Sequence, residues 1–322
     1  MAEKNNNKNY TMYNENEKTG DQTLVNPQTD IVFKEIFSKN KRALASLISS
    51  VIGRKVKAED ITVVPNEITS DGYNDKVARL DIEVLIGNEK YDIEMQICKE
   101  KGFYKRSRYY WAKLYTDNFK QGDKYSSLKP TICINIVNFV CFDKPEFVSR
   151  YQNVDTLGTE GSEYYVCKEI LELDTTYYIE LPKVKDIDPE TDIELWGKFF
   201  NVRKESDLAM LESKNKDLFC GADEDLKGIS QDDLKRKAAF KRERAEADYI
   251  NRYDDGFEDG FEDGIEKERV RNILKLHKYG LGINEISDAL SISADEVQRI
   301  IDSNKEAKND WFWKMNILRK RA

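Results

Sequence analysis

The strongest structural signal in the sequence is the segment RLDIEVLIGNEKYDIEMQI, residues 79–97. It contains two runs in which apolar and polar residues alternate, as expected of β-strands with one buried face. Gly87 and Asn88 lie between the runs and suit a two-residue primed turn, so the segment predicts a β-hairpin. With that turn, Asp81 lies directly opposite Glu94, whereas a loop of odd length would shift the pairing by one residue.

The alternation gives the predicted hairpin two chemically different faces. Acidic and amide side chains share one face, which is made by Asp81, Glu83, Asp92, Glu94 and Gln96. The other face is apolar and is made by Ile82, Val84, Ile86, Tyr91, Ile93, Met95 and Ile97. Opposed carboxylates repel one another at cross-strand spacing unless a cation or water separates them. The acidic face therefore indicates either a site for a hard divalent ion such as Mg²⁺ or Mn²⁺, or an outer strand face exposed to solvent.

The residues before the hairpin predict a helix and a strand. Thr29 or Asp30 is a suitable N-cap for a helix that ends at Gly53, with a break near residues 38–41. The segment ITVVPNEI (61–68) follows as a short strand at the edge of a sheet, because its proline cannot donate a ladder hydrogen bond.

The residues after the hairpin predict a helix at 103–121 and further strands at 130–142, 163–173 and 176–184. From about residue 186 the sequence becomes helical and highly charged, which indicates a separate region. The predicted parts are a disordered arm at 1–26, an α/β domain at 27–186 and a charged α-helical region at 187–322.

Several classes of site are excluded by composition. The five cysteines are widely spaced and form no CxxC pair, and His277 is the single histidine, so a disulfide framework, a zinc ribbon or a multi-histidine metal site is not expected. No GxGxxG or GxxxxGK[ST] motif is present, so any chemistry is expected to depend on carboxylates. No apolar run has the length of a membrane helix and the N-terminus has no apolar segment, so we expect a cytoplasmic protein without membrane contact.

The net charge of −8 is unevenly distributed along the chain. Residues 246–268 contain ten acidic and two basic residues, which leaves the rest of the chain balanced. Residues 99–113 contain six basic residues and one acidic residue. Within this basic stretch the side chains expected to contact the phosphates of a nucleic acid are Arg106, Tyr109 and Lys113, which share a helical stripe, and the nearby Lys105 and Arg108. A solvated helix face with half-buried tyrosines is the alternative interpretation.

Short motifs occur in a fixed order between about residues 28 and 185. They are DIVFKEIF with Asp30, Phe33 and Lys34, LDIEV with Asp81, IEMQ at 93–96, FYKRSRYY with Phe103, Arg106, Tyr109 and Tyr110, GDKYSSLKPTICINIVNF at 122–139 and IELPK at 179–183. In this order they resemble the Rpn family of recombination-promoting nucleases, also described as PD-(D/E)XK nuclease family transposases. The ordered series is much more specific than any one of its motifs.

The resemblance implies an α/β, restriction-endonuclease-like core, in which a central mixed sheet is flanked by helices and the hairpin strands carry the active site. By the same resemblance Asp81 and Glu94 are metal ligands, Met95 offers its backbone carbonyl, and Gln96 occupies the lysine position of the ExK signature. Glutamine can orient water, but it lacks the positive charge that lysine would bring to the phosphate. The implied cofactor is Mg²⁺ or Mn²⁺ and the implied partner is DNA. Asp30 is a candidate third acidic contributor, although an N-cap explains it equally well.

The C-terminal region predicts long helices. Residues 234–280 are expected to form one long helix or two in series, in which Gly256, Gly260 and Gly264 share a stripe. Interior glycines destabilise a helix, so the repeat favours close approach of a second copy and a homo-oligomer, with a flexible acidic linker as the alternative. Residues 282–301 have a helix–turn–helix form whose acidic second helix favours packing or partner contact over DNA reading. The tail, WFWKMNILRKRA, is basic and aromatic and could contact DNA or cover an apolar patch.

These observations lead to two hypotheses of different classes. The first is a Mg²⁺-dependent DNA endonuclease that hydrolyses phosphodiesters with Asp81, Glu94 and Gln96, and that resemblance links to recombination or mobile elements. The second is a catalytically inactive relative that acts as a DNA-binding or oligomeric interaction protein, which the neutral Gln96 and the overall acidity keep open.

Overall fold

The computed structural model describes residues 22–64, 80–155, 167–171 and 173–304 of the chain. These residues belong to two compact units, which divide between Ala247 and Asp248. We describe each unit by itself. The first unit contains the predicted hairpin and its surroundings.

A six-stranded mixed sheet forms the centre of the first unit, with the strand order β1-β2-β3-β4-β6-β5. The strands are β1 (Ile61–Val64), β2 (Ile82–Ile86), β3 (Glu89–Gln96), β4 (Thr131–Val137), β5 (Val148–Gln152) and β6 (Asp174–Glu180). The pairs β3–β4 and β4–β6 are parallel, and the other neighbouring pairs are antiparallel. Strand β1 lies at one edge of the sheet, as predicted for the segment 61–68, whose residues 65–68 lie outside the described residues.

The register of the β2–β3 hairpin agrees with the prediction. Ile82 pairs with Ile93 and Glu83 with Asp92, so the strands are joined by the two residues between Ile86 and Glu89. Gly87 has a φ of +59°, which a primed turn requires at its first central position and which glycine adopts without steric cost. A loop of odd length is thereby excluded.

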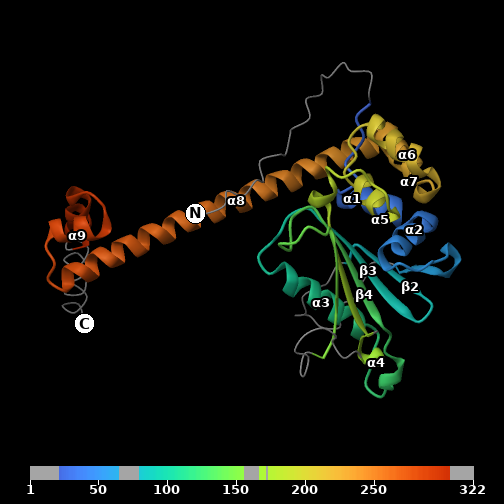
Figure 1. The fold of residues 1–322 in the computed structure, drawn as a ribbon, viewed down its shortest axis with the longest axis horizontal. Helices are drawn as coiled ribbons and strands as arrows, with labels where there is room; N and C mark the ends of the chain where they lie inside the picture. Colours follow the sequence, from blue (N-terminus) through green and yellow to red (C-terminus); the bar gives the residue numbers. More distant parts are fainter. Residues whose placement is uncertain (1–21, 65–79, 156–166, 172, 305–322) are drawn as a thin grey trace, which may run out of the picture. The chain divides into compact units, whose positions relative to one another are not determined.

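Helices cover both faces of this sheet (Figure 1). The helices on one side are α1 (Asp30–Phe37), α2 (Lys41–Ile52), α5 (Asp192–Phe199), α6 (Glu205–Phe219) and α7 (Ala222–Gln231). They share the main apolar core with the apolar face of the hairpin, including Val84, Tyr91 and Ile93. Helix α3 (Phe103–Thr116) lies on the other side, against β3 and β4.

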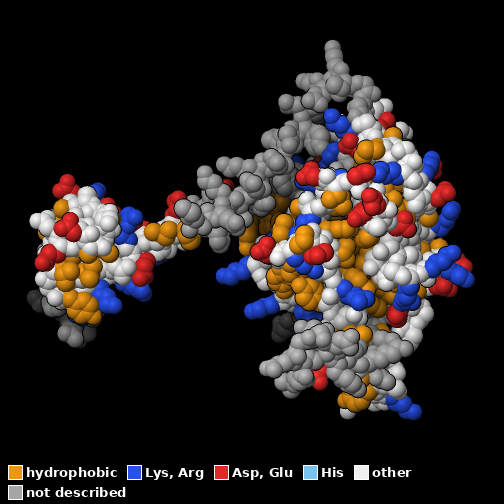
Figure 2. All heavy atoms as spheres, viewed as in Figure 1, with side chains coloured by type: hydrophobic (Ala, Val, Ile, Leu, Met, Phe, Trp, Pro, Cys, Tyr) orange, Lys and Arg blue, Asp and Glu red, His pale blue; other side chains and the backbone are white. Residues whose placement is uncertain are grey.

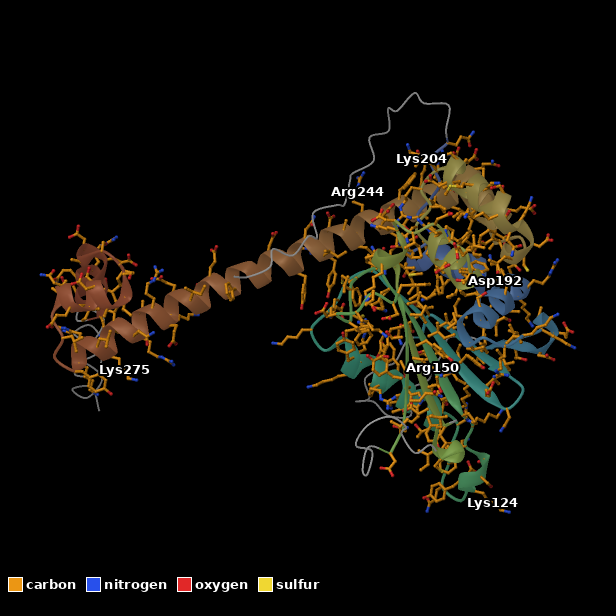
Figure 3. All side chains as sticks on the ribbon, in the orientation of Figure 1. Lys124, Arg150, Asp192, Lys204, Arg244 and Lys275 are labelled. Carbon is orange, nitrogen blue, oxygen red and sulfur yellow. The ribbon has the colours of Figure 1, made fainter. Side chains whose placement is uncertain are left out.

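The compact unit extends well beyond the boundary at residue 186 that the change in composition predicts. Trp196 and Phe199 of α5 are fully buried, and the Trp196 ring lies 5.6 Å from that of Phe37 in α1. Helices α5 and α6, whose starts are marked by Asp192 and Lys204 in Figure 3, therefore complete the core although their exposed faces are charged. The first unit accordingly reaches Ala247.

The first unit also begins earlier than the predicted end of the disordered arm at residue 26. Leu24 and Val25 are buried, and the backbone N–H of Val25 donates to Ser230 Oγ at 3.0 Å. Apolar residues this close to the chain start can be fixed by helices that come much later in the sequence. Residues 1–21 of the predicted arm lie outside the described residues.

Several local predictions differ from the structure. The segment predicted as a strand at 163–173 contains the short helix α4 (Lys168–Leu171), while 163–166 lie outside the described residues. Strand β5 was not predicted, and helix α3 ends at Thr116 rather than near residue 121. The remaining short segments are the 3-10 turns η1 (Ala58–Asp60), η2 (Tyr125–Ser127) and η3 (Leu181–Val184).

The second unit is helical. Helix α8 (Asp233–Lys278) is continuous, and its residues from 248 onward belong to this unit together with α9 (Ile283–Leu290) and a helical stretch at 294–304. A small core of Ile273, Ile286, Val297 and Ile301 holds these helices together in the predicted helix–turn–helix form. Apolar side chains are visible on this unit in Figure 2. The tail at 305–322 lies outside the described residues.

The glycine stripe of α8 is open in the structure. A Cβ added to Gly260 or Gly264 would meet no other atom within 4 Å, and the neighbouring Phe261 and Ile265 are exposed. Close packing within the described residues therefore does not account for these glycines, and self-association stays a prediction. Among the described helices, none combines the length and the apolar character that crossing a membrane requires.

Candidate active site

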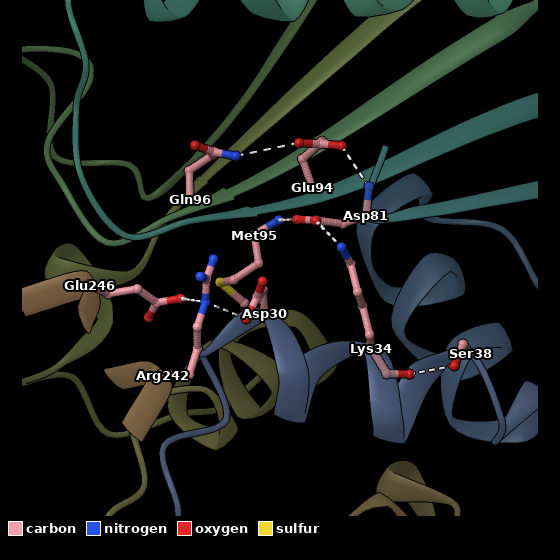
Figure 4. Close-up of polar contacts among 9 residues, drawn as sticks. All are labelled: Asp30, Lys34, Ser38, Asp81, Glu94, Met95, Gln96, Arg242 and Glu246. Atoms are coloured by element: carbon pink, nitrogen blue, oxygen red, sulfur yellow. Dashed lines mark hydrogen bonds and ion pairs between the residues drawn. The ribbon is translucent and has the colours of Figure 1, made fainter. Parts of the chain in front are cut away.

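Asp81 and Glu94 are joined by hydrogen bonds at the end of the hairpin (Figure 4). Asp81 precedes β2, and its backbone N–H donates to Glu94 Oε1 at 2.8 Å. In return, Asp81 Oδ2 accepts a hydrogen bond of 3.0 Å from the backbone N–H of Met95. The predicted pairing of these two residues thus places both carboxylates at one end of two adjacent strands.

Two cationic side chains approach this pair from opposite layers of the unit. Lys34 comes from α1, and its Nζ lies 2.8 Å from Asp81 Oδ1. Arg106 comes from α3, and its Nη2 donates to Gln96 Oε1, while its Nη1 lies 2.6 Å from Glu100 Oε2. Gln96 Nε2 in turn donates to Glu94 Oε2 at 3.3 Å, so Gln96 links the guanidinium to the carboxylate.

The acidic face of the hairpin is buried, which overturns the interpretation as a solvated outer face. Glu83, Asp92 and Glu94 are each at most 5 % exposed. Helix α3 packs on β3 and β4 and so covers the side of the sheet that carries Asp92 and Glu94. Alternation within the strands predicts which residues share this face, but it does not reveal what covers them.

Burial and mutual repulsion raise the pKa values of these carboxyl groups. Desolvation is the main cause of the increase in the pKa of Glu94 to about 8, and the neighbouring Asp81 charge adds to it. Desolvation also raises the pKa of Asp92 well above its ordinary value, followed by the charges of Glu94 and Asp81. The buried site therefore has a deficit of positive charge.

Asp92 is the site residue that sequence reasoning did not select. Its Oδ1 has no hydrogen-bond partner among the described residues, and its Oδ2 lies 3.8 Å from Cys133 Sγ. Asn135, opposite Glu94 in the parallel β3–β4 register, is also buried and accepts a bond from Ser107. The signal for Asp92 was its alternation with Glu94 and Gln96, whereas no signal in the sequence indicated that Lys34 would reach Asp81.

Asp30 does not take part in the hydrogen bonds that join Asp81 and Glu94. It is the first residue of α1, where Thr29 is the N-cap, and its Oδ1 lies 2.9 Å from Nε of Arg242 in α8. Arg242 also pairs with Glu246, and burial raises the pKa of Glu246 to about 7. Asp30 therefore connects α1 to the start of α8 in this structure.

The residues predicted to contact DNA lie on α3 and differ in their surroundings. Arg108 forms two hydrogen bonds to the Asp174 carboxylate, at 2.7 and 2.6 Å, and its guanidinium lies over the Trp111 ring. Lys113 lies over the Tyr109 ring at 5.8 Å. Lys105 is exposed. Arg108 is also exposed, whereas Tyr109 and Lys113 are half-buried.

The side chains at the hairpin end offer oxygen atoms, which are the ligands that a hard divalent cation prefers. Asp81 and Glu94 provide carboxylate oxygens, and burial together with the neighbouring Asp81 charge raises the pKa of Glu94. Among the described residues, no three His, Cys, Asp or Glu side chains are grouped as a ready metal cluster. A cation at this position would therefore need further oxygen ligands from the backbone, water or substrate.

Comparison with known proteins identifies the family of the chain. The family model for PD-(D/E)XK nuclease family transposase matches residues 27–256, which is most of the chain. The chain belongs to this family. The match includes α5, α6 and α7 as well as the hairpin, in agreement with their place in one core. Searches of curated proteins and of solved structures found no match.

The pKa of Glu94 predicts how stability depends on pH in the absence of metal. Native Glu94 keeps its proton up to a pH of about 8, whereas an unfolded glutamate loses it near 4.5. Between these values the unfolded state binds fewer protons, so the free energy of unfolding should fall as pH rises, by up to about 1.4 kcal/mol per pH unit from this group. Denaturant unfolding in EDTA at pH 5.5 and 8.5 measures this decrease.

Glu94→Gln should flatten the pH dependence, because glutamine resembles the neutral carboxyl group. Part of the decrease in stability with pH should remain in this variant, because the pKa values of Asp92 and Glu246 are also raised. Glu59→Gln, at an exposed position, serves as the control with unchanged slope. An equal slope in wild type and Glu94→Gln would contradict the raised pKa.

Proposed function

We propose that the protein is a divalent-metal-dependent DNA endonuclease that hydrolyses phosphodiester bonds at the end of the β2–β3 hairpin. The observation that carries the proposal is the hydrogen bond between half-buried Asp81 and buried Glu94 in a chain of this family. A structural role alone gives no reason to bury carboxylates together, because each raises the energy of the others' charged forms.

Asp81 and Glu94 would hold Mg²⁺ or Mn²⁺, with the backbone carbonyl of Met95 as a further ligand. Such an ion makes a bound water more acidic and neutralises charge that develops on the phosphoryl group. Glu94 must lose its proton to serve as a ligand, so binding of the ion should lower its pKa and release that proton.

The protein groups have complementary parts in this proposal. In hydrolysis one water adds across the phosphorus–oxygen bond: its oxygen bonds to phosphorus, and a proton reaches the departing oxygen. Gln96 is held by Arg106 on one side and donates to Glu94 on the other, so its amide has a fixed orientation beside the reacting water. Arg106 thereby acts through Gln96 as a positioning residue.

DNA would lie along the exposed side of α3. Lys105 and Lys113 can neutralise backbone phosphates, and Tyr109 can pack against a sugar or base. Arg108 contributes less, because a phosphate would compete with its two bonds to Asp174. These contacts carry no sequence information, so we expect binding without strong sequence preference. A part in recombination or mobile-element biology, and assembly of copies through the glycine stripe of α8, belong to the same proposal.

Removing either carboxylate should abolish cleavage. In a plasmid-nicking assay we expect wild type to cut in Mg²⁺ and not in EDTA, and Asp81→Asn and Glu94→Gln to be slower by about 100-fold or more, because each loses a charged ligand. Glu59→Gln, the exposed control, should cut like wild type.

Failure of the wild type to cut in both Mg²⁺ and Mn²⁺ would contradict the endonuclease. If the same protein still bound DNA, the result would favour the alternative of an inactive relative. The observation that favours this alternative is the neutral Gln96, which stands at the lysine position and contacts both Glu94 and Arg106.

Loss of a phosphate contact should change the salt dependence of DNA binding. For Lys105→Ala, the slope of log affinity against log salt should become shallower by about 0.9, because one fewer phosphate is neutralised. Fluorescence anisotropy with a labelled duplex in EDTA measures the slope without cleavage. Lys216→Ala changes an exposed lysine on α6, in the opposite layer, and should leave the slope unchanged. Equal slopes for wild type and Lys105→Ala would show that Lys105 does not contact a DNA phosphate.

A further inference from the structure

Lys34 places an ammonium group directly against a proposed metal ligand. Its Nζ lies 2.8 Å from Asp81 Oδ1, and its side chain remains 37 % exposed while that of Asp81 is 12 % exposed. The contact joins helix α1 to the hairpin end (Figure 4). A substrate that approaches Asp81 from solvent would therefore also meet Lys34.

The position of Lys34 is fixed by the core. Its neighbours Phe33 and Phe37 are fully buried, and the Phe33 ring lies 6.1 Å from that of Phe200. The start of the same helix is tied to α8 through the ion pair between Asp30 and Arg242. Helix α1 therefore presents Lys34 from a rigid support, as a catalytic side chain requires.

The site needs a positive charge that the other cations do not supply. A phosphodiester is an anion, and it must approach a hairpin end that carries several carboxylates. Arg106 is engaged with Gln96 and Glu100, and Lys90 donates from a buried position to the carbonyl oxygens of Leu114 and Asp117. Gln96, two residues after Glu94, is neutral.

We propose that Lys34 is a catalytic residue whose ammonium contacts a non-bridging oxygen of the scissile phosphate beside Asp81. It supplies from helix α1 the positive charge that the hairpin lacks at Gln96. Its charge stabilises the phosphoryl group as water attacks and the phosphorus–oxygen bond breaks. This inference rests on the proposed endonuclease function.

A purely structural role for Lys34 makes a different prediction about metal affinity. If Lys34 served only to hold Asp81 in place, its loss would disorder a metal ligand and weaken binding of the ion. If Lys34 acts on phosphate, its loss removes a charge that repels the ion, and binding should be equal or tighter. Isothermal titration with Mn²⁺ in the absence of DNA separates the two roles without measuring activity.

The test compares Lys34→Met, the double variant Lys34→Met/Gln96→Lys and Lys39→Met with wild type. Lys39 lies in the turn that follows α1, pairs with Glu35 at an exposed position and provides the matched loss of one positive charge. We expect Lys34→Met to melt near wild type, to nick plasmid about 100-fold more slowly and to bind Mn²⁺ at least as tightly. The double variant should recover at least tenfold of the loss, and Lys39→Met should cut normally.

Nicking by Lys34→Met within threefold of wild type would overturn the inference. So would weaker Mn²⁺ binding by Lys34→Met, or a double variant no faster than Lys34→Met. Each of these results leaves the endonuclease itself intact as long as wild type cuts and Asp81→Asn does not. Absence of cutting by wild type is the separate result that overturns both proposals.

Discussion

Repulsion among carboxylates buried on one face of the β2–β3 hairpin is the constraint on which the surrounding structure depends. Two unit charges about 4 Å apart near a protein surface repel by about 4 kcal/mol, which exceeds the net contribution of one hydrogen bond, about 1 kcal/mol. Glu94 and Asp92 respond with raised pKa values. Asp81 responds by pairing with Lys34. Protonation, a lysine and a bound cation are thus three ways of meeting the same electrostatic requirement.

The layered fold brings these compensating groups to one place. Helix α1 delivers Lys34 from the side of the apolar core, and helix α3 delivers Arg106 from the opposite side of the sheet. The ion pair between Asp30 and Arg242 ties α1 to the start of α8, and α5 completes the core beneath α1. All of these contacts lie within residues 27–256, the part of the chain that the family model matches.

Local patterns in the sequence were sufficient to predict the hairpin, but they did not predict the packing of the helices around it. The turn at Gly87 and the alternation of the strands predict the register of Asp81 and Glu94, because both depend on adjacent residues. The cover that α3 gives the acidic face, and the contact of Lys34 with Asp81, depend on tertiary packing between distant segments. The boundary near residue 186 was misjudged because α5 and α6 carry charged outer faces, while their buried side, with Trp196, belongs to the main core.

The central claim is that Asp81 and Glu94 bind one divalent ion between them. A crystal structure of the protein grown with Mn²⁺, with the metal located by its anomalous scattering, tests this most directly. The account predicts a peak at the hairpin end in contact with a carboxylate oxygen from each residue. The hydrogen bond that the Asp81 backbone N–H donates to Glu94 should be rearranged to admit the ion. The account would be contradicted if crystals grown in saturating Mn²⁺ showed no peak at this position and kept the Asp81–Glu94 and Asp81–Lys34 contacts unchanged.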